Sequence, residues 1–127
     1  MLVLLFLITL SFANSNYIDK DNVKSYIDKD VVICDLVQHV VVPNHNNSPY
    51  ILYFEEYSGA FSENKYSFNG IIWSNSVSVL EINPKSELSG KFICINGTVS
   101  MYNGVAQIVV LKPSQISIVN TKSLGVK

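Results

Sequence analysis

The chain has 127 residues, with nine lysines, no arginine and ten acidic residues, and its formal net charge is −1. This length is typical of a single domain, and the charge balance lacks the basic excess of most nucleic-acid-binding domains. Without arginine the chain lacks the side chain best suited to bidentate binding of phosphate or guanine. The charge is uneven along the chain: residues 1–83 hold four lysines and nine acids, a net charge of −5, whereas residues 84–127 hold five lysines and one acid, a net charge of +4. The second half could therefore still present a positive surface.

The amino-terminal segment has the pattern of a secretory signal. An apolar run extends from Leu2 to Leu10, and Ser11 and Ala13 place small residues where signal peptidase cleaves. The run is too short to span a bilayer, which needs about 20 residues. We predict a signal peptide over residues 1–15, cleaved near Ala13 or Ser15, and an exported protein, periplasmic or secreted, with no membrane span after cleavage. Because no Lys or Arg precedes the run, an uncleaved anchor and a misassigned start codon stay as alternatives.

Residues 16–30 form a polar segment with a near-repeat: Tyr17–Asp21 recurs as Tyr26–Asp30. The spacing is far shorter than the repeat of any solenoid, so it favours one short helix leading into the next region. Asp21 or Asn22 can cap this helix. Three apolar side chains would share one of its faces: Val23, Tyr26 and Ile27.

From Val31 onward the apolar side chains alternate, which predicts strands. Five strands are expected: Val31–Val42, Tyr50–Glu55, Tyr66–Ser74, Lys91–Tyr102 and Val105–Leu111. Gly97 marks a bend or bulge in the fourth strand, and Asn103-Gly104 is the pair favoured in a type I′ hairpin turn. Residues 76–88 could form a strand end or a helical turn, ended by Pro84. The pattern predicts an all-β domain over residues 31–120, a small closed barrel without exposed edges. It ends with a short apolar segment at 116–119 and is followed by a flexible tail at 121–127.

Three stretches of the chain resemble bacterial OB-fold nucleic-acid-binding domains. Ser89–Val110 and the following Pro113-Ser114-Gln115-Ile116 are similar to the closing hairpin of that family, and Tyr26–Val37 is similar to its opening segment. The resemblance implies a five-stranded OB-type Greek-key barrel with a short amino-terminal helix, here in an exported member. The chain departs from the family where Asp28 and Asp35 replace glycines, where Ala106 replaces a proline and where basic residues are missing around Gly104.

Aromatic residues gather on the second and third predicted strands and on their connection. OB-folds bind oligomers on this face, and a base stacked on an exposed ring contributes about 1–3 kcal/mol. Most of these rings are expected to fill the barrel, but alternation places Tyr53 on the same side as Glu55 and so in solvent. An Asn-rich loop around His45 could donate hydrogen bonds, or it is an ordinary solvated loop. The predicted ligand-binding residues are Tyr53, Tyr66, Trp73, His45, Lys91, Tyr102, Asn103 and Lys112.

The two cysteines do not indicate a metal site, because Cys34 and Cys94 are 60 positions apart. The resemblance makes their strands neighbours, so they form either a disulfide or two buried thiols. Glu55, Glu56, Asp35 and Glu63 could supply a pair of catalytic carboxylates, but a nuclease would also want an arginine for the developing charge on phosphate. We predict a protein that is not an enzyme and has no cofactor.

The function implied by the resemblance is binding of nucleic acid, single-stranded and with weak sequence specificity. The alternative is an envelope or secreted OB domain that binds a small molecule, a glycan or a protein partner.

Overall fold

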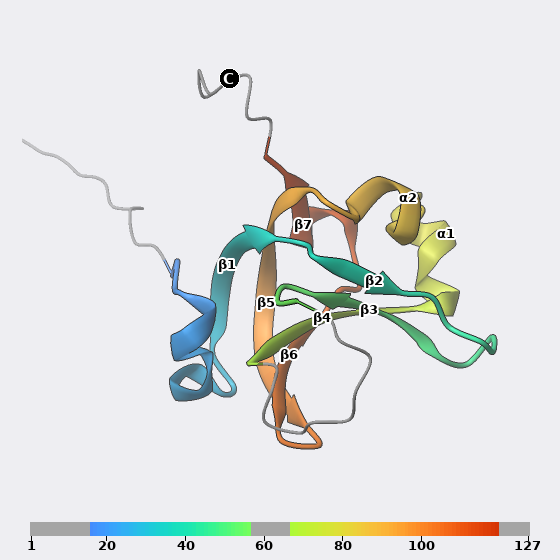
Figure 1. Ribbon diagram of the computed structural model, residues 1–127. Helices are drawn as coiled ribbons and strands as arrows, with labels where there is room; N and C mark the ends of the chain where they lie inside the picture. Colours follow the sequence, from blue (N-terminus) through green and yellow to red (C-terminus); the bar gives the residue numbers. More distant parts are fainter. Residues whose placement is uncertain (1–15, 57–66, 120–127) are drawn as a thin grey trace, which may run out of the picture.

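The computed structural model describes residues 16–56 and 67–119, and these are mostly β (Figure 1). Seven strands form one curled mixed sheet, a half-barrel, accompanied by a few short helices. Among the described helices, none has the length and apolar character needed to cross a membrane. The predicted signal peptide at 1–15, the ring of Tyr66 and the tail at 121–127 lie outside the described residues.

The strands follow the predicted segments closely, with two additions. Their bounds are β1 Asp30–Leu36, β2 His39–Val41, β3 Pro49–Tyr53, β4 Phe68–Trp73, β5 Phe92–Tyr102, β6 Val105–Val109 and β7 Ile116–Ile118. Along the sheet the order is β1-β5-β6-β4-β3-β2, and β7 pairs with β5. The pairs are antiparallel except β4 with β6, which is parallel. There are thus seven strand segments and not five, because the first predicted strand is divided and the last apolar segment adds a short strand.

The first predicted strand is divided into β1 and β2, which lie at the two ends of the sheet. Val37 donates its backbone N–H to Lys91 beside β5, whereas the next residue, Gln38, donates to Tyr53 of β3. The chain therefore changes partner between consecutive residues. Since β1 and β2 stand at opposite ends of the strand order, this one stretch of chain draws the ends toward each other and curls the sheet.

The turn between β5 and β6 has the backbone that its sequence predicts. Asn103 and Gly104 have φ angles of 51° and 81°, and a type I′ turn requires positive φ at both central residues. Figure 1 shows this hairpin extending beyond the rest of the sheet. The prediction of a tight Asn-Gly hairpin is confirmed.

The amino-terminal helix is a 3-10 helix, η3, over Lys20–Tyr26, and it begins after Asp19 without a side-chain cap. The caps proposed at Asp21 and Asn22 are therefore wrong. Its apolar face is as predicted: Val23 is buried, and Tyr26 and Ile27 pack against the core.

The segment between β4 and β5 is helical. It contains η4 Ser74–Ser76, α1 Val77–Leu80 and α2 Pro84–Leu88. Pro84 was expected to end an element, but it begins α2, because its fixed φ suits the first turn and that turn needs no N–H from it. The side chain of Asn83 accepts a hydrogen bond from Ser86 N and caps the helix.

The core lies on the concave side of the sheet and is almost entirely aliphatic. Phe54 and Phe68 are fully buried and stack with their ring centroids 5.4 Å apart. Leu80 and Leu88 of the two α-helices and Val23 of η3 join the same cluster. Alternation along β3 is as predicted, because Leu52 and Phe54 point inward and Tyr53 does not.

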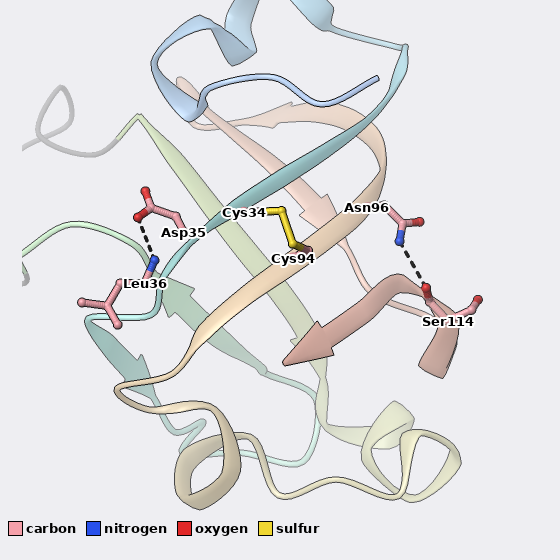
Figure 2. Close-up of a disulfide and its surroundings, with 6 residues drawn as sticks. All are labelled: Cys34, Asp35, Leu36, Cys94, Asn96 and Ser114. Atoms are coloured by element: carbon pink, nitrogen blue, oxygen red, sulfur yellow. Dashed lines mark hydrogen bonds between the residues drawn. A yellow bond between two sulfur atoms is a disulfide. The ribbon is translucent and has the colours of Figure 1, made fainter. Parts of the chain in front are cut away.

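Cys34 and Cys94 form a disulfide, with an Sγ–Sγ distance of 2.04 Å (Figure 2). The two residues are direct partners in the β1–β5 register, and their Cα atoms are 3.9 Å apart. They are half-buried, while their neighbours Ile33, Ile93 and Ile95 are fully buried. The bridge therefore lies on the face opposite the core, and the first of the two alternatives for the cysteines is confirmed.

Replacing both cysteines by alanine should lower the free energy of unfolding by about 4 kcal/mol, the chain-entropy value for releasing a loop of this length. The effect should show in urea or thermal unfolding of the double variant. Adding a reductant to the wild-type protein should produce the same loss, and no further loss in the double variant. Equal stability of the wild type and the variant would contradict this role of the bridge.

Gln115 joins β5, β6 and the following loop. Its Nε2 donates to Asn96 O (2.9 Å) and Val109 O (3.0 Å), and its Oε1 accepts from Leu111 N (2.8 Å) and Lys112 N (3.2 Å). A Cβ atom on Gly97 would lie 2.8 Å from this Nε2, so the absence of a side chain there lets the amide approach β5. Asn96 Nδ2 adds a bond to Ser114 O (Figure 2). Gln115 is the only polar residue among the buried ones of the described chain.

The substitution Gln115→Ala should lower the free energy of unfolding by about 2–3 kcal/mol, because it leaves two backbone carbonyls and two N–H groups without their partner. Gln38→Ala, at an exposed position, is the matched control and should change it by less than about 0.5 kcal/mol. Chemical denaturation of both variants measures the difference. A Gln115→Ala protein as stable as the control would show that the loop holds without this amide.

Candidate ligand-binding face

The convex side of the sheet carries a continuous set of outward side chains that we call the outer face. It is made by β2, β3, β4 and β6, whose other side chains point into the core. Its members are His39, Val41, Ile51, Tyr53, Asn69, Ile71, Trp73, Gln107 and Val109.

Strand register aligns these side chains in rows. One row is aliphatic: Val41 pairs with Ile51, Ile51 with Ile71 and Ile71 with Val109. Ile71 is only 6% exposed, although it does not belong to the core cluster. The outer face therefore has an apolar strip across four strands.

The adjacent row is polar and aromatic. His39 pairs with Tyr53, Tyr53 with Asn69, Asn69 with Gln107, and Gln107 with Ser100 of β5. The rings of His39 and Tyr53 are 6.4 Å apart, and Gln107 Nε2 donates to Ser100 Oγ at 3.5 Å. Amides, hydroxyls and rings thus border the apolar strip.

The four strands of the outer face contain no Asp, Glu, Lys or Arg. Their one titratable group near neutral pH is the His39 imidazole. Burial lowers the pKa of His39, and the positive charge of Lys85 lowers it further. The outer face is accordingly uncharged at neutral pH.

The predicted rings that can be located lie on the convex side. Tyr53 is half-buried in the polar row, and Trp73 is 40% exposed at the end of β4. Trp73 pairs with Pro49, directly after the loop that holds the exposed His45. Ser74 Oγ donates to Ser48 O and ties that loop to the end of β4. Tyr102, 66% exposed, pairs with Val105 and stands on the same side of the sheet, at its hairpin end.

The predicted lysines and Asn103 lie away from these rings. Lys91 precedes β5, and its Nζ is 3.5 Å from Glu87 O of α2. Asn103 follows β5, so it is separated from Lys91 by the whole strand, roughly 40 Å along the chain. Lys112 follows β6, in the loop held by Gln115. The structure brings Tyr53 and Trp73 onto one face, with Tyr102 at its hairpin end, but does not gather the predicted positive charges there.

Several residues of the outer face were absent from the predicted set, above all Asn69 and Gln107. Alternation along a strand shows that they point outward, but only the cross-strand register places them beside Tyr53. Asn69 has a further property: its Oδ1 is buried and has no hydrogen-bond partner among the described residues. A buried acceptor without a donor costs about 1–3 kcal/mol.

Two of the acidic residues considered for catalysis make contacts that hold parts of the fold together. Glu55 accepts hydrogen bonds from Ser67 N (3.0 Å) and Ser67 Oγ (2.7 Å), and Asp35 Oδ2 is 2.9 Å from Lys20 Nζ. Glu63 lies outside the described residues. Within residues 16–56 and 67–119, no three His, Cys, Asp or Glu side chains are grouped closely enough to hold a metal ion.

Comparison with known proteins adds no relative. No protein-family model matches the chain, and no curated protein matches it.

The lowered pKa of His39 predicts a pH dependence of stability. The unfolded chain takes up a proton near pH 6.5, before the folded protein does, so the free energy of unfolding should fall as the pH drops from above 6.5 through the lower pKa of the folded state. The variant His39→Gln has no proton to take up and should show a smaller loss over the same interval. Urea unfolding of both proteins on either side of this interval measures it. An equal loss in both would assign the pH dependence to other groups.

Proposed function

We propose that the protein is an exported, non-catalytic binding module with an OB-type barrel, and that its outer face binds an uncharged oligomeric ligand, a glycan. The observation that carries the ligand class is the outer face itself, which combines rings and amides with an apolar strip and has no charge. Nucleic acid, the ligand implied by the sequence resemblance, is the competing outcome of the test below.

The strand connections support the OB-type Greek-key barrel. If β1 and β2 are counted as one bent strand and β7 as an addition, five strands remain. The first then pairs with the second through β2 and with the fourth through β1, and the third pairs in parallel with the fifth. The Pro113–Ile116 motif is part of the resemblance and contains Gln115. The four hydrogen bonds of Gln115 hold the loop after β6 against β5.

Export is supported by the disulfide, because such bonds persist in oxidising compartments and are rare in the cytosol. The signal-like pattern of residues 1–15 points the same way.

A glycan matches the outer face better than a phosphate backbone does. Sugars present C–H faces that pack on rings such as Trp73 and Tyr53, and hydroxyl groups that exchange hydrogen bonds with amides. Binding of nucleic acid draws much of its affinity from lysine and arginine contacts with phosphate, and the four strands contain neither residue.

Absence of catalysis is proposed on the same contacts. Asp35 and Glu55 are engaged by Lys20 and Ser67, and neither carboxylate belongs to the four strands of the outer face. The outer face offers rings, amides and aliphatic side chains, which can bind a ligand, and its four strands have no carboxylate to catalyse a reaction.

The test is binding of the mature protein to soluble oligosaccharides, chitohexaose and cellohexaose, by calorimetry, beside fluorescent oligo-dT at low and at high salt. We expect an oligosaccharide to bind with little salt dependence. Trp73→Ala and Tyr53→Ala should each weaken it by about tenfold, a loss of about 1.4 kcal/mol. Tyr17→Ala is the matched control, because Tyr17 is 68% exposed and lies off the outer face.

Failure of both oligosaccharides to bind, or binding unchanged by the two ring substitutions, would overturn the proposal. Oligo-dT binding that weakens steeply with salt would assign the function to nucleic acid instead. Thermal unfolding of each variant shows that a loss of binding is not a loss of fold.

A further inference from the structure

A concave site, separate from the rows of the outer face, lies around the middle of β5. It is a groove of about 620 Å³ whose floor is residues 96–100 of β5. One bank is the start of β1, which pairs with this part of β5. The other bank is the end of β6 with the following loop, which Gln115 ties to Asn96. The volume falls within the range of about 300–1,000 Å³ that is usual for small-molecule sites.

The two banks carry opposite charges. Asp28 and Asp30 line the bank beside β1, and Lys112 lines the opposite bank. The single ion pair of the described residues joins Lys20 to Asp35, so these three charges are not neutralised by ion pairs there. Asp30 accepts a hydrogen bond from Thr98 Oγ1, which fixes its carboxylate above the floor.

Asp28 is held in an unusual conformation at the edge of this groove. Its φ is 69°, in the left-handed region that non-glycine residues rarely adopt. Its backbone N–H donates to Val99 O at 2.8 Å, a bond that anchors it to the floor strand. This bond holds the backbone of Asp28 at the edge of the groove, which its side chain lines.

The spacing of the banks limits the length of a ligand that can span them. They lie on either side of β5, about 10 Å apart at two inter-strand spacings. An extended dipeptide is about 7 Å long, and flexible Asp and Lys side chains reach over the remainder. A divalent cation fits less well, because the described residues offer no cluster of three acidic or imidazole ligands.

We propose that this groove binds a short zwitterion of dipeptide length, with its ammonium group toward Asp28 and Asp30 and its carboxylate toward Lys112. The apolar side chains that share the groove, among them Val32 and Leu111, can hold the middle of such a ligand. The proposal is independent of glycan binding, since the groove shares only Val109 and Ser100 with the rows of the outer face.

The test uses L-alanyl-L-alanine as the probe, with the full mature chain, followed by NMR chemical-shift titration. We expect the free dipeptide to bind, and its N-acetylated and C-amidated forms to bind about tenfold more weakly, which corresponds to about 1.4 kcal/mol for each lost charge contact. Shifts should be largest at Asn96–Ser100 and at Lys112.

The variants Asp28→Asn and Lys112→Gln should each weaken binding of the free dipeptide by a similar factor. Asparagine tolerates a positive φ, so the first variant keeps its backbone. Asp21→Asn and Lys85→Gln, at exposed positions outside the groove, are matched controls and should bind as the wild type does. The proposal is overturned if the dipeptide does not bind, if both blocked forms bind equally well, or if the groove variants behave like the controls.

Discussion

The exchange of partners along β5 is the constraint on which the rest of the structure depends. Its first half is paired with β1 and β7, and its second half with β6, so the strand belongs to both sides of the curl. Where the partner changes, Gly97 leaves room for the Gln115 side chain. Its amide donates hydrogen bonds to the backbone carbonyls of Asn96 and Val109. This junction curls the sheet and also forms the floor and one bank of the groove.

The curl separates two kinds of surface. The four strands from β6 to β2 present a face without charge, whereas the acids and lysines of the described residues lie on the amino-terminal segment, β1, the helices and the loops. A ligand held by the outer face would gain contact area and hydrogen bonds, and one held in the groove would gain charge contacts. The proposed glycan and zwitterion follow from this difference in chemistry.

Two departures from the resembling family acquire physical meaning in the structure. Asp35 stands in register with the buried Ile93, near the end of the sheet, and Lys20 of η3 neutralises it there. The hydrogen bond from Lys20 to Asp35 raises the pKa of Lys20, so Lys20 stays charged at neutral pH, and the ion pair holds η3 against β1. Asp28 adopts the positive φ that a glycine would adopt without cost, and it gives the groove a carboxylate.

The sequence by itself determined the local properties: the strand segments, the Asn103-Gly104 turn, the apolar face of η3 and the alternation that sends Tyr53 outward. These depend on side-chain period and on backbone preferences of one or two residues, which neighbours in the chain decide. The prediction that Pro84 ends an element was wrong because a proline can also begin a helix, as it does in α2. The predicted caps of η3, Asp21 and Asn22, lie two and three residues after the residue that precedes the helix, Asp19. Only the tertiary structure decided that Asn69 and Gln107 lie in one row with Tyr53, that Gln115 is buried, and that Asp28 and Lys112 line the same groove. Each of these depends on which residues pair across strands, and the free energy that selects such pairs comes from contacts between positions far apart in the chain.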